Sequence, residues 1–108
     1  MGMSKNELNE IKSRYLQEEL YILFSKNLNK LDWNVNQGKK LINFNYDKFT
    51  FEYSYKNINK NKELDENKTL YEKISIVDSN KSYENLYPAL SNVEEIINKR
   101  IKWILERI

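Results

Sequence analysis

Two runs of alternating residues decide the fold: Ile42-Asn43-Phe44-Asn45-Tyr46, followed by Phe49-Thr50-Phe51-Glu52-Tyr53-Ser54-Tyr55. In each run an aliphatic or aromatic side chain alternates with a polar one, which is the period of a half-buried β-strand. Asp47-Lys48 separates the runs, so the pattern predicts a β-hairpin with one apolar, aromatic face. We expect helices to cover this face and to make its rings part of the core. The alternative is an exposed platform on which single-stranded nucleic acid stacks.

Upstream of the hairpin, the sequence predicts a helix over about residues 5–30. Ser4 and Glu7 have the spacing of a capping box at its start. Two sets of apolar residues recur at helical spacing. One set is Leu8, Ile11, Tyr15 and Ile22, and the other is Leu16, Leu20, Leu23, Phe24 and Leu31. Because the sets come together at residues 20–24, we expect that part of the helix to be buried nearly all round. Residues 32–38 then predict a turn or a short edge strand.

Downstream of the hairpin, residues 57–68 are polar and predict a mobile surface connection. Residues 69–78 predict a third strand, in which the apolar side chains alternate. Residues 83–90 indicate irregular structure or one helical turn around Pro88. The spacing of Ser91-Asn92-Val93-Glu94 then predicts a second capping box at the start of a C-terminal helix. One face of that helix is formed by Val93, Ile97, Ile101, Ile104, Leu105 and Ile108.

The order of these elements predicts one α+β domain over residues 1–108, with residues 1–4 either disordered or a cloning scar. It contains an N-terminal helix, a three- to four-stranded antiparallel sheet and a C-terminal helix, and both helices lie on one face of the sheet. The longest apolar run, residues 20–24, is much shorter than the ~20 residues that span a bilayer. No signal peptide is visible, so we expect a cytoplasmic protein without a membrane anchor.

The composition excludes several kinds of catalytic chemistry. The 108 residues include no Cys and no His, which removes thiolate nucleophiles, imidazole bases and the usual zinc ligands. Only two Gly are present, so no Gly-rich loop can hold a phosphate. We therefore expect no enzymatic activity, no catalytic residues, no metal and no cofactor.

The chain has 18 Lys and Arg against 16 Asp and Glu, a net charge of +2, which is too small for a protein that coats nucleic acid. Asn, Lys and Ile account for 16, 15 and 11 residues. Their codons are A/T-rich, so we expect an A/T-rich genome, such as that of a low-GC bacterium, its phage or another mobile element. Many of the Lys and Asn residues are then explained by codon bias on a solvated surface.

Two sets of residues are candidates for binding a partner. A ridge on the C-terminal helix lies beside the predicted core face and combines one Trp with two of the chain's three Arg, residue types that are enriched in binding hot spots. We call it the Trp103 ridge, and it consists of Ile96, Arg100, Trp103 and Arg107. The second set could contact phosphates or a second protein surface, and consists of Lys39, Lys40, Lys48, Lys56, Lys60 and Lys62.

These observations favour a small non-enzymatic interaction protein that binds and blocks a macromolecular target. Its size and apparent origin suit an inhibitor from a phage or mobile element, of the anti-CRISPR, anti-defence or immunity type, acting on a protein such as a nuclease or a nucleoprotein complex. One alternative is a nucleic-acid-binding module built on the Lys- and Tyr-rich hairpin, although we expect only weak, nonspecific affinity for nucleic acid. Another is an oligomeric phage accessory or structural subunit, and a homodimer is compatible with either role.

Overall fold

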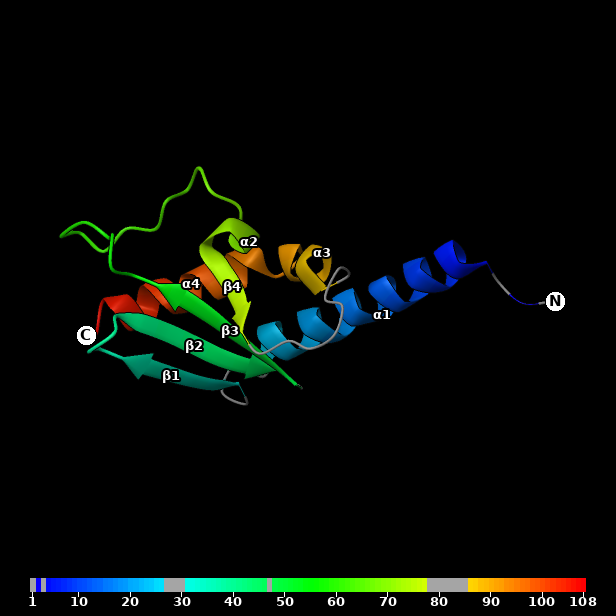
Figure 1. The fold of residues 1–108 in the computed structure, drawn as a ribbon, viewed down its shortest axis with the longest axis horizontal. Coiled ribbons are helices and arrows are strands. Elements are labelled where there is room, and N and C mark those ends of the chain that lie inside the picture. Colours follow the sequence, from blue (N-terminus) through cyan, green and yellow to red (C-terminus); the bar gives the residue numbers. More distant parts are fainter. Residues whose placement is uncertain (1, 3, 27–30, 47, 78–85) are drawn as a thin grey trace.

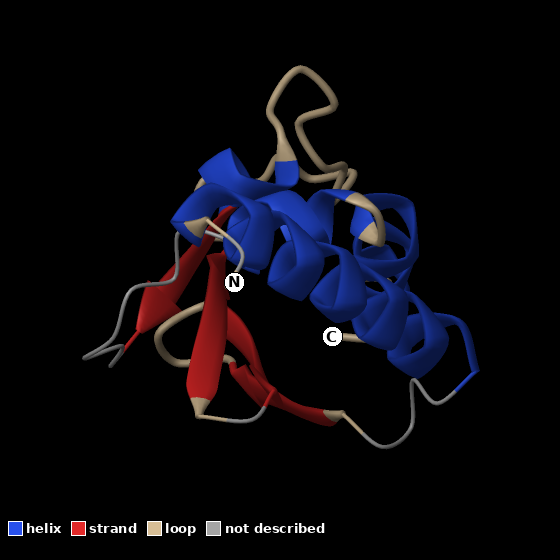
Figure 2. Cartoon of the chain, turned by 90° about the vertical axis from the view of Figure 1, so that its right-hand side faces the viewer, coloured by secondary structure: helices blue, strands red, loops and turns tan. Residues whose placement is uncertain are grey.

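A computed structural model describes the whole chain except residues 1, 3, 27–30, 47 and 78–85. Its core is a four-stranded antiparallel sheet in the order β1-β2-β3-β4, with helices gathered on one face (Figures 1 and 2). This confirms the predicted α+β architecture. The elements are α1 (Lys5–Lys26), β1 (Asp32–Asn36), β2 (Leu41–Tyr46), β3 (Phe49–Ser54), α2 (Leu70–Lys73), β4 (Ile74–Val77), α3 (Leu86–Ser91) and α4 (Glu94–Leu105).

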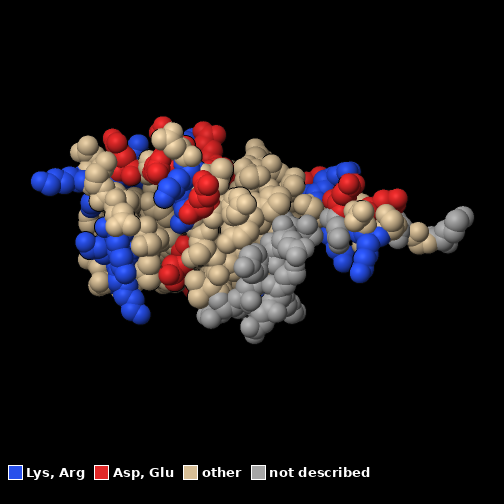
Figure 3. All heavy atoms as spheres, turned by 45° about the horizontal axis from the view of Figure 1, so that its top comes forward, with Lys and Arg blue, Asp and Glu red and all other residues tan. Residues whose placement is uncertain are grey.

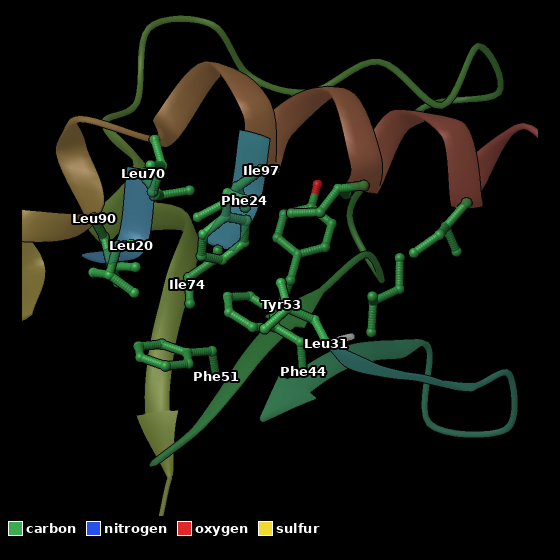
Figure 4. Close-up of a cluster of buried hydrophobic side chains, with 14 of the residues drawn as sticks. Leu20, Phe24, Leu31, Phe44, Phe51, Tyr53, Leu70, Ile74, Leu90 and Ile97 are labelled. Atoms are coloured by element: carbon green, nitrogen blue, oxygen red, sulfur yellow. The ribbon is translucent and has the colours of Figure 1, made fainter. Parts of the chain in front are cut away.

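The aromatic face of the β2–β3 hairpin forms the centre of the core. Phe44 pairs with Phe51 across the strands, and their rings stack with centroids 4.8 Å apart. From the helical layer, the ring of Phe24 meets Phe44 edge-on at 5.9 Å, as the close-up shows (Figure 4). All three rings are at most 2% exposed. The prediction of a buried face is therefore confirmed, and a stacking platform for nucleic acid on these rings is excluded.

The opposite face of the sheet is polar and lies away from the helices. Asn34, Asn43 and Glu52 are cross-strand neighbours on this face. In the next row, Thr50 donates a hydrogen bond to Asn45, with 2.8 Å between the side-chain oxygens. The two periodic faces of the hairpin thus separate as the alternation predicts, with one in the core and one toward solvent.

Helix α1 begins as predicted, but its burial differs from the prediction. The backbone N–H of Glu7 donates to Ser4 Oγ at 3.2 Å, which satisfies one of the free donors of the first turn. Leu20 and Phe24 are fully buried, whereas Tyr21 and Ile22 between them are 55% and 52% exposed. The expectation of all-round burial is wrong because the sheet and the other helices cover only one side of α1. The predicted end near residue 30 lies outside the described residues.

Residues 69–78 do not form one strand. Residues 70–73 form the single helical turn α2, and the backbone N–H of Thr69 donates to Glu72 Oε2 at 2.7 Å, as in a capping box. The strand starts only at Ile74, which pairs with Tyr53 of β3. Leu70 is still buried in the core, so the apolar pattern correctly indicates its burial and not its secondary structure.

The C-terminal segment consists of two helices. α3 is the helical turn expected around Pro88, although residues 83–85 lie outside the described part of the chain. The second capping box is wrong, because Ser91 is the last residue of α3 and its Oγ donates to the carbonyl of Pro88 at 2.6 Å. The N-cap of α4 is Val93, which is fully buried and has no side-chain oxygen to accept a hydrogen bond.

The molecule is elongated, with extents of 57 × 28 × 26 Å. The cause is α1, whose C-terminal half packs under α3 and α4 while its N-terminal half projects beyond the sheet (Figure 1). A hydrogen bond of 2.7 Å from Asn92 Nδ2 to Gln17 Oε1 ties α1 to the start of α4. Within the described residues, no helix is both long enough and apolar enough to cross a membrane.

Candidate functional site

Helix α4 carries the strongest candidate site, on the side that its packing does not use. Ile97, Ile101, Ile104 and Leu105 face the core and are at most 6% exposed. This set forms the core face of the helix, as the sequence pattern predicts, and Ile96 packs against the core beside it. The remaining sides of α4 are therefore free to carry other groups without loss of the core contacts.

Trp103 lies on that free surface and is held between two arginines of the same helix. Its side chain is 44% exposed. The guanidinium carbon of Arg107 lies 3.7 Å from the centroid of the indole ring, and that of Arg100 lies 4.4 Å from it. Arg107 Nη1 also donates to the carbonyl oxygen of Trp103 at 2.8 Å. These cation–π contacts pre-order the indole and both cations before any partner arrives.

The other two members of the Trp103 ridge are closer to the core. Ile96 is half-buried and packs against the core cluster, so it is the member of the ridge that contacts the core. Arg100 is also half-buried, and its Nε atom is buried and without a hydrogen-bond partner among the described residues. Contacts join Arg100, Trp103 and Arg107, of which Trp103 and Arg107 are exposed, and helical spacing places Ile96 one turn before Arg100. That these residues bind a partner stays a prediction.

Five of the six candidate lysines gather at one end of the molecule (Figures 1 and 3). Lys39 and Lys40 lie in the β1–β2 turn, and the backbone N–H of Tyr55 donates to the Lys40 carbonyl at 2.9 Å, which places Lys56 beside them. Lys60 and Lys62 lie in the following loop. Lys48, in the β2–β3 turn, is at the opposite end of the sheet. We call Lys39, Lys40, Lys56, Lys60 and Lys62 the basic end.

The Trp103 ridge and the basic end meet at the C-terminus of α4. Lys62 Nζ donates a hydrogen bond to the carbonyl of Ile108, the residue next to Arg107. On the other flank of α4 is an open groove of about 850 Å³ lined by several carboxylates, including Glu63, Asp65 and Glu95. Among the described residues the only salt bridge joins Lys99 to Glu95 on this acidic flank. Arg100 and Arg107 stack on Trp103, Lys62 donates to the Ile108 carbonyl, and no salt bridge among the described residues involves the ridge or the basic end.

The sequence reasoning missed a small aromatic pocket between α2 and α3. Tyr71 is 59% exposed, and its ring lies 4.9 Å from that of Tyr87. Together with Leu70 and Pro88 they line a pocket of about 370 Å³. The pocket could not be foreseen because residues 70–73 read as strand. No spacing in the sequence singles out Tyr71 and Tyr87 as neighbours, because their contact depends on how α2 packs against α3.

Comparisons with protein-family models, with curated proteins and with solved structures found no match. Within the described ranges, no group of three or more Asp or Glu side chains is arranged to hold a metal ion. The interpretation of the site therefore rests on its own geometry: an α+β fold with an exposed Trp–Arg ridge beside a cluster of lysines.

Proposed function

We propose that this protein is a small non-enzymatic binding protein that docks on a macromolecular target through the Trp103 ridge and blocks it. The observation that carries the proposal is the exposed indole of Trp103, held by two arginines on a helix whose core face is already filled. The exposed part of the Trp103 ring is not used in folding, whereas it supplies apolar area on binding.

The chemistry of the ridge favours an acidic target surface. Arg107 uses Nη1 for the carbonyl of Trp103, and its remaining guanidinium N–H groups can donate hydrogen bonds to a carboxylate or a phosphate. The adjacent basic end extends the positive potential and would steer an acidic partner toward the ridge. A protein enzyme that acts on nucleic acid is a fitting target class, because such an enzyme either carries nucleic acid or presents acidic residues at its active site. This is the action of an anti-defence or immunity protein from a phage or mobile element.

A capture experiment tests the proposal. The full chain is immobilised and exposed to lysate of an A/T-rich bacterial host, with and without nuclease treatment, and the recovered protein is then titrated against variants. Trp103→Ala should weaken its binding by roughly 30-fold or more, the ~2 kcal/mol typical of a hot spot. The double variant Arg100→Glu/Arg107→Glu should weaken binding at least as much. Both should melt within a few degrees of the wild type, since neither side chain is fully buried.

A matched control uses the opposite flank of the same helix. Lys102→Glu makes the same change of charge as the single variant Arg107→Glu, on a residue that lines the groove on the other side of α4. It should leave binding nearly unchanged. Unchanged binding by both ridge variants would move the interface elsewhere, and a large loss of thermal stability in Trp103→Ala would make the indole a packing residue instead.

A nucleic-acid-binding module is the second candidate, supported by the basic end, whose lysines lie in the β1–β2 turn and in the loop after β3. Half of the hairpin rings are buried and the other three are partly buried against the core, so these lysines are not interleaved with a row of fully exposed rings. The nuclease arm of the capture experiment separates the two functions. Partners that disappear after nuclease treatment support this candidate, and a protein recovered equally in both arms supports the blocking protein.

A further inference from the structure

A second apolar surface runs along α1 and has no partner among the described residues. Leu8, Tyr15 and Ile22 are spaced seven residues apart and are 41%, 69% and 52% exposed. Ile11 is half-buried and lies between the first two on the same side of the helix. We call these four residues the α1 stripe.

The α1 stripe is not part of the packing of α1 in the fold. The core side of the helix carries Leu20 and Phe24, which are fully buried, with Leu16 and Leu23 beside them. At 100° per residue, the centre of the stripe lies about 150° from the centre of this core side. The N-terminal half of α1 also projects beyond the sheet (Figure 1). An exposed apolar surface of this kind is typical of an interaction site.

We propose that the α1 stripe pairs with the same stripe of a second copy of the chain, in an antiparallel two-helix interface about a two-fold axis. The spacing supports a helical partner: a repeat of seven places Leu8, Tyr15 and Ile22 at one seam position of a coiled coil and Ile11 at the other. Glu18, seven residues after Ile11, occupies the next seam position equivalent to that of Ile11. The proposal is independent of the Trp103 ridge, which lies on a different helix.

The charges beside the stripe show why the partner would be a second copy. On one flank of the stripe, Lys12 lies beside its N-terminal half and Glu19 beside its C-terminal half, while Glu7 and Arg14 lie on the other flank. Two copies that run antiparallel can therefore pair Lys12 of each with Glu19 of the other. The two-fold axis then forms every favourable pair twice.

One register satisfies the seam and its flanks together. Setting Tyr15 against Glu18 of the second copy brings the tyrosine hydroxyl to a carboxylate that can accept its hydrogen bond. The same register sets Lys12 against Glu19 and Arg14 against the ring of Tyr21. Its cost is a contact between two lysines, Lys5 and Lys26, at the exposed ends, where salt screens the repulsion. A parallel pair would instead place the two Glu18 carboxylates against each other in the seam.

The interface is small, so the dimer should be in equilibrium with the monomer. From Leu8 to Ile22 the stripe is about 21 Å long, at ~1.5 Å per residue. Two such stripes bury less surface than a standard stable interface. The test is sedimentation equilibrium of the full chain from roughly 10 µM to 1 mM, a range that covers weak association. The mean mass of the wild type should rise from that of a monomer toward twice that value.

Charge reversals make the test specific for the antiparallel register. Lys12→Glu and Glu19→Lys should each lower the association constant roughly tenfold or more, because each reverses two pairs. An equimolar mixture of the two variants should associate again, since both contacts between positions 12 and 19 then join opposite charges between unlike chains. Glu10→Lys is the control: it makes the same charge change as Glu19→Lys on an exposed side of α1 away from the stripe, and should dimerise like the wild type.

The outcomes decide the proposal. Tyr15→Glu should remain a monomer with an unchanged melting midpoint, because Tyr15 is 69% exposed. A wild type that stays monomeric at every concentration overturns the proposal. So does a dimer that Trp103→Ala abolishes and Tyr15→Glu does not, since that dimer would use the ridge. A mixture that fails to associate, although each single variant is impaired, overturns the antiparallel arrangement. Partner capture by the ridge is a separate readout and can succeed or fail independently.

Discussion

Replacing Phe51 by alanine is the most direct test of the core. The ring of Phe51 is fully buried and stacks 4.8 Å from Phe44, and the ring of Phe49 lies 6.4 Å away on its other side. Removing it loses the transfer energy of a large ring and leaves a cavity, a total cost of roughly 3–5 kcal/mol. A domain of this size is typically stable by only ~5–15 kcal/mol, so the variant should lose a large part of its stability. The melting midpoint should fall by about 12–20 °C.

Urea titration and melting curves of Phe51→Ala beside the wild type measure this cost. The matched control is Tyr21→Ala, which removes a ring of similar size that is 55% exposed, and should change stability by no more than about 0.5 kcal/mol. If Phe51→Ala is as stable as the wild type and instead loses its partner, the aromatic face is a binding surface. The assignment of Phe51 to the core would then be refuted.

Two further predictions concern pH and salt. Burial raises the pKa of Tyr53 from 10.0 to about 12. The folded state therefore favours the neutral hydroxyl, so the free energy of unfolding keeps its full value below pH 10 and falls as the pH rises from 10 through 12. The free energy of unfolding should fall by about 3 kcal/mol over this pH range. Urea unfolding midpoints measure the fall, which should be smaller in Tyr53→Phe than in the wild type. DNA or RNA binding should be weak and fade steeply with salt, and Lys40→Glu should weaken it more than Lys48→Glu, because Lys40 belongs to the basic end. Tight binding that survives roughly 0.2 M salt would favour the nucleic-acid module.

The hairpin and the core face of α4 were predictable from the sequence because their periods are strict. An alternation of two fixes which side of a strand is buried, and Phe44 and Phe51 fall on that side in both strands. The apolar repeat of α4 likewise fixes its core face. Given those two patterns, the arrangement of the Trp103 ridge follows from helix geometry alone, so the sequence sufficed to place its four residues on one surface.

Other features depend on tertiary contacts that the sequence does not encode locally. Residues 70–73 are too few to show a helical period, and the capping contact between Thr69 and Glu72 decides their conformation. The two apolar sides of α1 looked like one broad buried face, because periodicity does not reveal how many sides the fold covers. The gathering of Lys40 and Lys62 depends on the path of a loop, which no pattern in the chain predicts.

The distribution of residue types separates the candidate surfaces from codon bias. We expect A/T-rich codons to account for the asparagines on the polar face of the sheet and for many surface lysines, so the basic end alone is weak evidence of binding. They do not account for Trp103 or for Arg100 and Arg107, in a chain whose other cationic side chains are 15 lysines and Arg14. These residues also form the ordered cation–π contacts of the ridge. Where composition and geometry both depart from the background of the chain, a functional cause is favoured. That is the reason to test the ridge before the lysines.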